Sequence, residues 1–368
     1  MSTSETRVHL HPLQFGEKER PIVESGELTA EGFRYDSGVA ALRLRNARGE
    51  AVLLPYQGQQ IWDARFDERI LTMRSQFAQP IATQEYLHNY GAFFLHCGAT
   101  AMGNPGAEDR HPLHGELPNA PYDSAAVVIG SDAHGPYLGL TGTYHHTVAF
   151  GCSYRAEPLV TLHAGSAVLH TSITITNLKR TEMELMYLAH INFRPVDHGR
   201  LVYTAPCNPQ SVAVRTKLPR GLQAPEGYVP FLESLERDPA LHNTLDPAHA
   251  YNPEVVMYLH YQADPEGRAH SLLMHPDGYA FYVGHRPSEL DHAVRWISRT
   301  PDNDAIGIVL PATAGADGYS AEKAKGNIKI LPSGGSVSFS FQTGLLTPDQ
   351  ARELAQRIEA VMTGRQKR

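Results

Sequence analysis

The sequence has few cysteines, few charged residues and no long apolar run. Its 368 residues include three cysteines, Cys97, Cys152 and Cys207, an odd number with no C-x-x-C spacing. This pattern indicates neither a disulfide framework nor a cysteine-type structural zinc site, and it favours a reducing compartment. No segment approaches the roughly 18 consecutive apolar residues of a membrane-spanning helix, and the N-terminus lacks the pattern of a signal peptide. We therefore expect a soluble, cytoplasmic protein with no membrane partner.

Charged residues are scarce, and the acidic ones outnumber the basic ones. Charged residues form 19% of the chain, below the roughly 25% that is usual for soluble domains. Lys and Arg number 32 against 39 Asp and Glu, which gives a formal net charge of −7. Because no basic block is present, the chain has no electrostatic footprint for nucleic acid, and we expect no nucleic-acid partner.

What the sequence does contain is many short strands separated by turns. It has 31 glycines and 26 prolines, and apolar residues alternate with polar ones in runs bounded by turn residues. Residues 42–54 predict a hairpin closed at Asn46 to Gly49. Residues 160–177 predict a second hairpin, whose returning arm alternates apolar and hydroxyl residues, as a strand with one wet face does. The pattern predicts an all-β protein.

Two stretches depart from the strand pattern. Thr347 and Gln350 form a capping box for a helix with Pro348 in its first turn, and Gly364 ends it. Residues 217–252 are Pro-rich and irregular, with a short helix predicted at 231–237, and long excursions of this kind are often functional. We therefore divide the chain into an N-terminal arm (1–20), one β-sandwich domain (21–346) and a C-terminal helix (347–368).

Histidine is abundant, with 20 copies, and it is densest between residues 88 and 123. This segment carries His88, His96, His111 and His114 together with Asn119. Histidine can donate or accept a proton near neutral pH, because small changes of its pKa cross the working range. Surface loops carry polar residues in any case, so any one of these histidines can be an ordinary loop residue. The strongest candidate for a functional role is His114, because it lies inside the tight Leu-His-Gly-Glu turn.

A second polar group is formed by His190, Asn192 and Arg194. Residues two apart in a strand project from the same face, so the three predict a polar row suited to the hydroxyl groups of a sugar. Trp296 is a candidate to stack on a sugar ring, or else a core residue. The substrate-binding candidates are Asn119, Asn192, Arg194, His96, His88 and Trp296.

Two of these segments resemble a known family. HPLHGELPNAP at 111–121 resembles the Leu-His-Gly turn of the aldose 1-epimerase (galactose mutarotase) superfamily, and LMYLAHINFRP at 185–195 resembles its second-histidine strand. The order CGATAMGN, LHGELPNAP, YLAHINFRP and IGIVLPAT is similar to a poorly characterised aldose-1-epimerase-like branch, over residues 40–345. The resemblance implies a β-supersandwich that binds a small-molecule carbohydrate on one open sheet face.

The resemblance also implies chemistry. Mutarotation needs a general acid for the ring oxygen and a general base for the anomeric hydroxyl, so that the ring opens and recloses on the other face. By position His190 matches the acid, and His114 matches the histidine that binds and polarises the sugar. The implied function is anomeric interconversion of a free monosaccharide or sugar acid.

The sequence departs from the family at the general base. Leu310 stands where the superfamily has a glutamate, and leucine cannot take a proton. The arginine that usually follows the Gly-Ala-Thr stretch is replaced by Gly103 and Asn104. Glu322 and Asp317, in the loop that follows Leu310, are the first candidates to substitute as a catalytic carboxylate, and Glu116 is a third.

Two other functions remain open from the residues. One is a metal-assisted epimerase or isomerase that acts at another carbon of the sugar. Its divalent metal ion could be bound by His111, His114 and His190, with His96 and Glu116. A protein that kept the fold and lost the base would be a non-catalytic sugar-binding protein. We expect no cofactor, and exposed sheet edges favour a homodimer.

Overall fold

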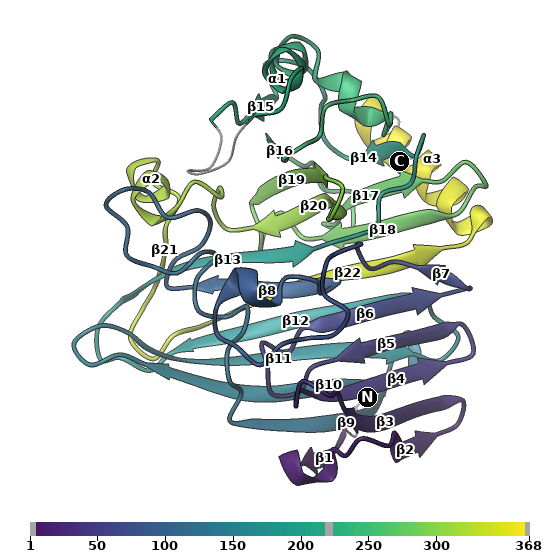
Figure 1. Ribbon diagram of the computed structural model, residues 1–368, viewed down its shortest axis with the longest axis vertical. Coiled ribbons are helices and arrows are strands. Elements are labelled where there is room, and N and C mark those ends of the chain that lie inside the picture. The colour runs from purple at the N-terminus through teal and green to yellow at the C-terminus, as the bar shows by residue number, and fades with distance from the viewer. Residues whose placement is uncertain (1–4, 218–223, 365–368) are drawn as a thin grey trace.

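The computed structural model describes residues 5–217 and 224–364, and two large antiparallel sheets dominate this part of the chain (Figure 1). The first is a nine-stranded sheet with the order β1-β9-β10-β11-β12-β22-β18-β17-β14. Its strands are β1 (Thr6–Leu10), β9 (Ser124–Asp132), β10 (Gly135–Thr147), β11 (Ser153–His163), β12 (Val168–Asn177), β14 (Arg200–Tyr203), β17 (Ala269–Met274), β18 (Ala280–His285) and β22 (Ser336–Leu346).

The second sheet has thirteen strands within the described residues. Eleven follow the order β15-β16-β19-β20-β13-β8-β6-β5-β4-β3-β2, while β21 pairs with β13 and β7 with β6. The strands are β2 (Arg20–Ser25), β3 (Leu28–Arg34), β4 (Ala40–Asn46), β5 (Gly49–Leu53), β6 (Ile61–Phe66), β7 (Arg69–Ile70), β8 (Phe94–Ala99), β13 (Met183–Ile191), β15 (Val212–Val214), β16 (Val255–Leu259), β19 (His292–Arg299), β20 (Asp304–Ala312) and β21 (Lys329–Leu331).

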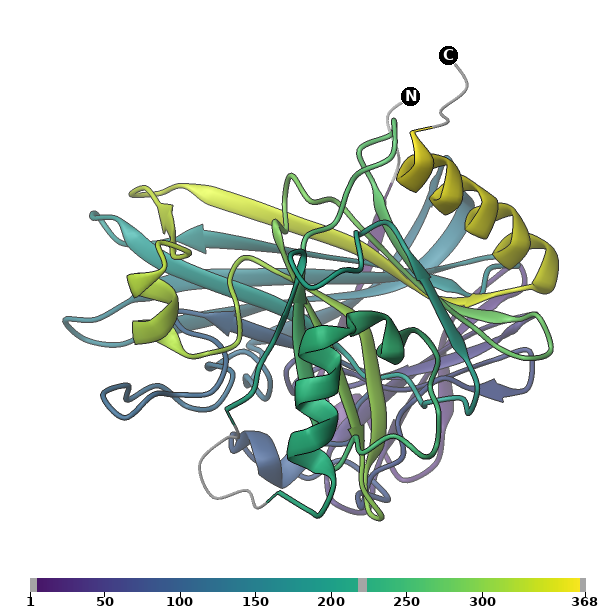
Figure 2. The same cartoon turned by 90° about the horizontal axis from the view of Figure 1, so that it is seen from above.

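The two sheets pack face to face, as the view from above shows (Figure 2). Along β12, Leu169 and Ile173 are fully buried and join the main core, whereas Thr174 on the other face bonds Ser338 of β22 through their hydroxyl oxygens at 2.8 Å. A strand with one apolar and one hydroxyl-bearing face is stable only when the apolar face is covered. The predicted all-β supersandwich and both predicted hairpins are confirmed.

Three α-helices lie outside the sheets in the described residues: α1 (Tyr228–Arg237), α2 (Tyr319–Ala324) and α3 (Pro348–Thr363). Helix α3 has the predicted capping box between Thr347 and Gln350, and Gly364 ends it in the left-handed conformation. Its apolar face packs on a small core over β17, β18 and β22. Three short 3₁₀ turns are η1 (Pro12–Gln14), η2 (Tyr86–Asn89) and η3 (Pro239–Asn243).

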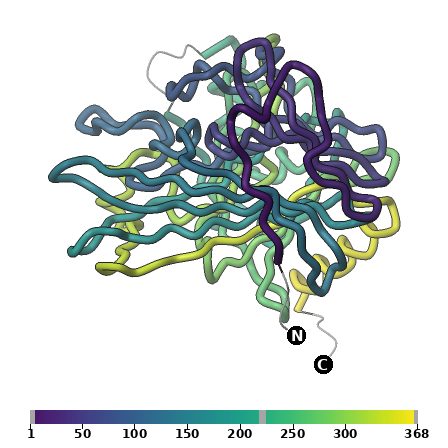
Figure 3. The backbone as a smooth tube through the Cα atoms, turned by 90° about the horizontal axis from the view of Figure 1, so that it is seen from below, coloured from purple at the N-terminus to yellow at the C-terminus, as the bar shows by residue number. Residues whose placement is uncertain are grey.

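The ends of the predicted divisions are only partly described. The N-terminal arm contains β1, which pairs with β9 along one edge of the nine-stranded sheet (Figure 3). The predicted excursion contains α1 and η3, and its residues 218–223 lie outside the described part, as do residues 365–368 of the predicted C-terminal helix. In the described residues no helix has the length and apolarity needed to cross a membrane.

Candidate functional site

The Leu-His-Gly turn is held by backbone hydrogen bonds that only glycine permits at its centre. His114 and Gly115 both have positive φ, of 59° and 80°. The His114 carbonyl accepts from the Gly98 amide at 2.9 Å, and the Gly98 carbonyl accepts from the Leu117 amide at 2.8 Å. A Cβ atom on Gly115 would lie 2.4 Å from the Gly98 carbonyl oxygen and 2.3 Å from that of Ala101. The tight approach to β8 therefore fixes where the His114 ring points.

His190 lies near the end of β13, and its partner determines which nitrogen carries the proton. Its Nδ1 is 2.7 Å from Oδ1 of Asn192, while Nδ2 of Asn192 donates to the Ala92 carbonyl at 2.9 Å. Because that amide nitrogen faces a carbonyl, Oδ1 must face His190, and Nδ1 of the imidazole must donate. The neutral ring therefore offers an Nε2 lone pair.

The two histidines line one cavity of about 700 Å³, which we call the His114–His190 cavity. Their ring centroids are 5.2 Å apart, at 87°. Tyr86 tilts against His114 at 4.9 Å, and Trp296 of β19 meets the edge of His190 at 5.4 Å. Tyr90 lies 5.9 Å from His190 and 6.2 Å from Trp296, so five rings enclose one side of the cavity.

Burial keeps both imidazoles neutral at pH 7. Burial lowers the pKa of His190 to about 4, although the hydrogen bond to Asn192 acts in the opposite direction. Burial, and then the nearby His190 and Arg215, lower the pKa of His114 well below its usual value. Nδ1 of His114 is buried without a hydrogen-bond partner among the described residues. Each ring can therefore accept a proton or exchange a hydrogen bond with a ligand, but neither is a resting imidazolium.

One wall of the cavity is hydrocarbon at the place where the family resemblance implies a carboxylate. Leu310 of β20 lines it and pairs with Val294 of β19. Leu188 of β13 and Val256 of β16 continue this wall on the neighbouring strands. These four side chains are at most 4% exposed.

Two carboxylates line the cavity, Asp109 and Glu254, and sequence analysis missed Glu254. Glu254 accepts from Nε1 of Trp296 at 2.6 Å and forms an ion pair with Arg215. These two charged residues flank the excursion, and strand pairing between β15 and β16 brings them together. The only sequence signal for them was the position of a long irregular segment between two strands.

Comparisons with known proteins agree with the fold described above. A family model described as Domain of unknown function (DUF4432) matches residues 36–204, and no curated protein matches the sequence. A solved structure from Klebsiella pneumoniae, described as a "putative aldose 1-epimerase", is 15% identical, with a TM-score of 0.81 over 98% of this chain and 96% of that one. The chain has the galactose mutarotase-like fold.

Two further mutarotase-like structures extend the likeness. A galactose mutarotase-like protein from Clostridium acetobutylicum is 13% identical, with a TM-score of 0.57 over 88% of this chain and all of that one (100%). Another, from Lactobacillus casei, is 14% identical, with a TM-score of 0.52 over 83% and 100%. At such identities the agreement concerns the mutarotase-like fold, which confirms the resemblance drawn from the Leu-His-Gly turn and the β13 strand.

Within this mutarotase-like fold, two predicted binding residues serve the protein's own contacts. Asn119 is 3% exposed, and its Oδ1 accepts from Asn89 and Gln60 at 2.9 and 2.8 Å. His96 is fully buried on β8, with Nδ1 2.7 Å from the Tyr187 hydroxyl. Neither lines the His114–His190 cavity. Asn192 acts on that cavity through His190.

The predicted row of His190, Asn192 and Arg194 does not stay on one surface. β13 ends at Ile191, and Arg194 lines a separate cavity of about 330 Å³ beside Trp62. Its Nε donates to the Thr72 carbonyl at 3.1 Å. His88 is exposed on η2 and lies outside the His114–His190 cavity, whereas Trp296 lies within it.

The two carboxylates predicted to replace the base are both outside the lining of the His114–His190 cavity. Glu322 is fully buried and accepts from the Gly315 amide, Asn327 and Lys325 at 2.7 to 2.8 Å. Asp317 accepts from the Tyr258 hydroxyl and from Lys325, each at 2.7 Å. The third, Glu116, accepts from the Thr100 amide at 3.0 Å and from the Tyr154 hydroxyl at 2.9 Å.

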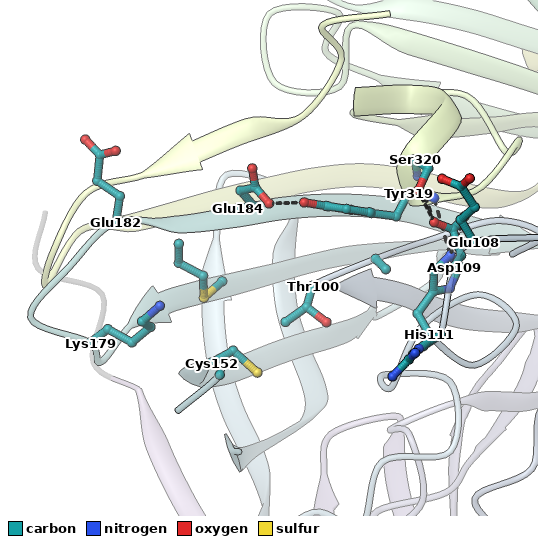
Figure 4. Close-up of a pocket in the computed structure, with 14 residues that line it drawn as sticks. Thr100, Glu108, Asp109, His111, Cys152, Lys179, Glu182, Glu184, Tyr319 and Ser320 are labelled. Carbon is teal, nitrogen blue, oxygen red and sulfur yellow. Dashed lines mark hydrogen bonds and ion pairs between the residues drawn. The ribbon is translucent and has the colours of Figure 1, made fainter. Parts of the chain in front are cut away.

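The predicted metal ligands are divided between two cavities. His111 lines a cavity of about 580 Å³ under α2, which it shares with Asp109, Tyr319 and Glu184 (Figure 4). Its Nδ1 is 2.8 Å from the Pro112 carbonyl, and its Nε2 accepts from the Tyr319 amide at 3.3 Å. Within residues 5–217 and 224–364, no three His, Cys, Asp or Glu side chains are arranged to hold a metal ion. His111 therefore does not join His114 and His190.

Proposed function

We propose that this protein is a carbohydrate epimerase that interconverts the anomers of a free monosaccharide in the His114–His190 cavity. The proposal rests on the two neutral imidazoles of His114 and His190. Their ring centroids are 5.2 Å apart, at one side of a cavity of about 700 Å³ in a mutarotase-like fold. A cytoplasmic location is part of this proposal, since the three cysteines are free.

Leu310 and the state of His190 suggest a one-histidine proton relay. Nε2 of neutral His190 takes the proton of the anomeric hydroxyl, the bond between C1 and the ring oxygen breaks, and the same nitrogen returns the proton to the ring oxygen. The open aldehyde then rotates about its C1–C2 bond and recloses by the reverse steps. His114 binds the sugar by a hydrogen bond, and Trp296 stacks against it. In this scheme His190 begins as a base, whereas the family resemblance implies an acid.

The test is anomer exchange measured by NMR for a panel of monosaccharides and sugar acids. We expect acceleration for at least one sugar, and a loss of at least about 100-fold in His190→Ala, since acid–base groups contribute that much or more. His170→Ala, on the outer face of the nine-stranded sheet, is the matched control and should keep the exchange rate. Unchanged exchange in His190→Ala would refute the relay.

A second candidate is a non-catalytic sugar-binding protein, which Leu310 favours because it removes the family's base from the cavity. In that case a sugar raises the melting temperature but no panel member exchanges faster. A metal-assisted epimerase would instead lose activity on chelation and regain it with a divalent ion.

A further inference from the structure

The His114–His190 cavity has a hydrocarbon wall and a hydrocarbon rim. The wall is formed by Leu188, Val256, Val294 and Leu310, from four strands of the thirteen-stranded sheet that pair in the order β16-β19-β20-β13. Leu87, on η2 at the rim, is 63% exposed. Such a surface releases free energy only when the ligand presents hydrocarbon to it.

The charged groups of the cavity are already paired inside the protein. Arg215 forms its ion pair with Glu254. Asp109 accepts from the Gly106 amide at 2.9 Å and from both the amide and the hydroxyl of Ser320. Arg215 is the one Lys or Arg among the described lining residues, and the carboxylate of Glu254 balances its charge. The arrangement suits a neutral sugar better than a sugar acid.

An ordinary hexose fits this wall poorly. Every ring carbon of a free hexopyranose except C5 carries a hydroxyl, and C6 carries another, yet Leu188, Val294 and Leu310 have no group to accept or donate a hydrogen bond. A hydroxyl buried against them loses its water without compensation. Mutarotation requires a closed ring and a free hydroxyl at C1, so the hydrocarbon group must be on another carbon, and C6 is the carbon of a hexopyranose that can be a methyl group.

We infer that the substrate is a neutral 6-deoxyhexose, whose C6 methyl group lies against the wall of Leu188, Val294 and Leu310 while its anomeric end meets His190. This inference rests on the proposed function for the orientation of the sugar. The preference for a methyl group over a hydroxymethyl group depends on the wall alone.

The test uses sugar pairs that differ only by the C6 hydroxyl: L-rhamnose with L-mannose, L-fucose with L-galactose, and D-fucose with D-galactose. Titration calorimetry and NMR exchange are measured for both members of each pair. For the pair with the correct stereochemistry, the 6-deoxy sugar should bind and exchange at least about tenfold better, the scale on which an apolar pocket rejects an added hydroxyl.

Val294→Thr supplies the matched variant, because threonine nearly reproduces the shape of valine and adds one hydroxyl to the wall. It should reduce the preference for the 6-deoxy sugar within the pair. Equal affinities within every pair, or stronger binding of a uronic acid, would overturn the inference and leave mutarotation intact. Selective binding of a 6-deoxy sugar without exchange would instead support the inference and overturn the proposed catalysis.

Discussion

A single amide decides what the imidazole of His190 can do. Because Asn192 is anchored to the Ala92 carbonyl, it can only accept from His190, and the reactive nitrogen is left as a lone pair. His114 depends in the same way on its neighbour, since Gly115 lets the turn approach β8 closely enough to orient the ring. At this site the proton position of His190 and the ring orientation of His114 are set by residues that do not line the cavity.

Gly115→Ala should therefore disturb both stability and the site. Alanine at a φ of 80° is strained, and its Cβ would collide with two backbone carbonyl oxygens. We expect a loss of at least about 3 kcal/mol in the free energy of unfolding, from strain plus overpacking. Chemical denaturation measures the loss, and NMR exchange should fall with it.

The control separates the close approach from the backbone conformation. Gly38 has a similar φ of 86°, but nothing lies within 4 Å of the position of its Cβ. Gly38→Ala should cost only the strain of a left-handed alanine, about 1–2 kcal/mol, and leave exchange unchanged. Equal losses for the two variants would contradict the role assigned to the approach to β8.

At the scale of elements, Asn119 joins three segments around the cavity. Its side chain bonds Gln57 and Gln60 of the turn before β6, Asn89 of η2, and the Glu85 carbonyl. Since η2 carries Tyr86 against His114, this amide connects the Leu-His-Gly segment to the cavity's aromatic side. We assign Asn119 a positioning role.

Asn119→Ala should loosen η2. The substitution leaves buried amide donors without an acceptor, so we expect a loss of about 2–4 kcal/mol in stability. Hydrogen exchange should rise at residues 81–90, and sugar affinity should fall. Asn177→Ala is the matched control: Asn177, at the end of β12, is fully buried and bonds three carbonyl groups, none of them in η2. It should lose similar stability without faster exchange at 81–90.

The elements were more predictable from sequence than the site. Strand alternation and the Thr347 capping box are local patterns, and both appear where predicted. The prediction that Arg194 shares a sheet face with His190 was wrong. Same-face spacing holds only within a strand, and β13 ends at Ile191. Glu254 and Arg215 could not be found, since only the pairing of β15 with β16 brings them together.

Sequence nearness to Leu310 also proved a poor guide to position. Glu322 follows Leu310 closely in the chain, but the bonds it accepts from Gly315 and Asn327 hold it in the loop around α2. A carboxylate placed by such contacts stabilises the loop. Whether the fold keeps a catalytic base therefore depends on which residues the thirteen-stranded sheet turns toward the cavity.

At the scale of the whole molecule, the abundance of histidine has a consequence that no single site explains. His96, His190, His275 and His285 are each at most 7% exposed. Burial lowers the pKa of His190 and His275 to about 4, and that of His96 and His285 to about 3. These side chains must stay neutral in the folded protein, so acid favours the unfolded chain.

The direction of the change in stability with pH follows from the number of protons that the folded and unfolded states bind. Between pH 6.5 and about 4 the unfolded chain protonates these histidines and the folded protein does not, so stability is complete above the unfolded pKa and falls as the pH is lowered. Each histidine contributes up to about 1.4 kcal/mol per pH unit in that window. The Asp side chains whose pKa is lowered, such as Asp264 at about 2, act mainly below this window.

We therefore expect the free energy of unfolding to decline by several kcal/mol between pH 6.5 and 4.5, measured by chemical denaturation at each pH. Calorimetry in buffers of different ionisation enthalpy should detect proton uptake on unfolding. His285→Gln, which cannot take a charge, should reduce both the slope and the uptake by one group. A flat stability between pH 7 and 5 would mean that these four histidines are protonated without loss of the fold, and their burial would then need another explanation.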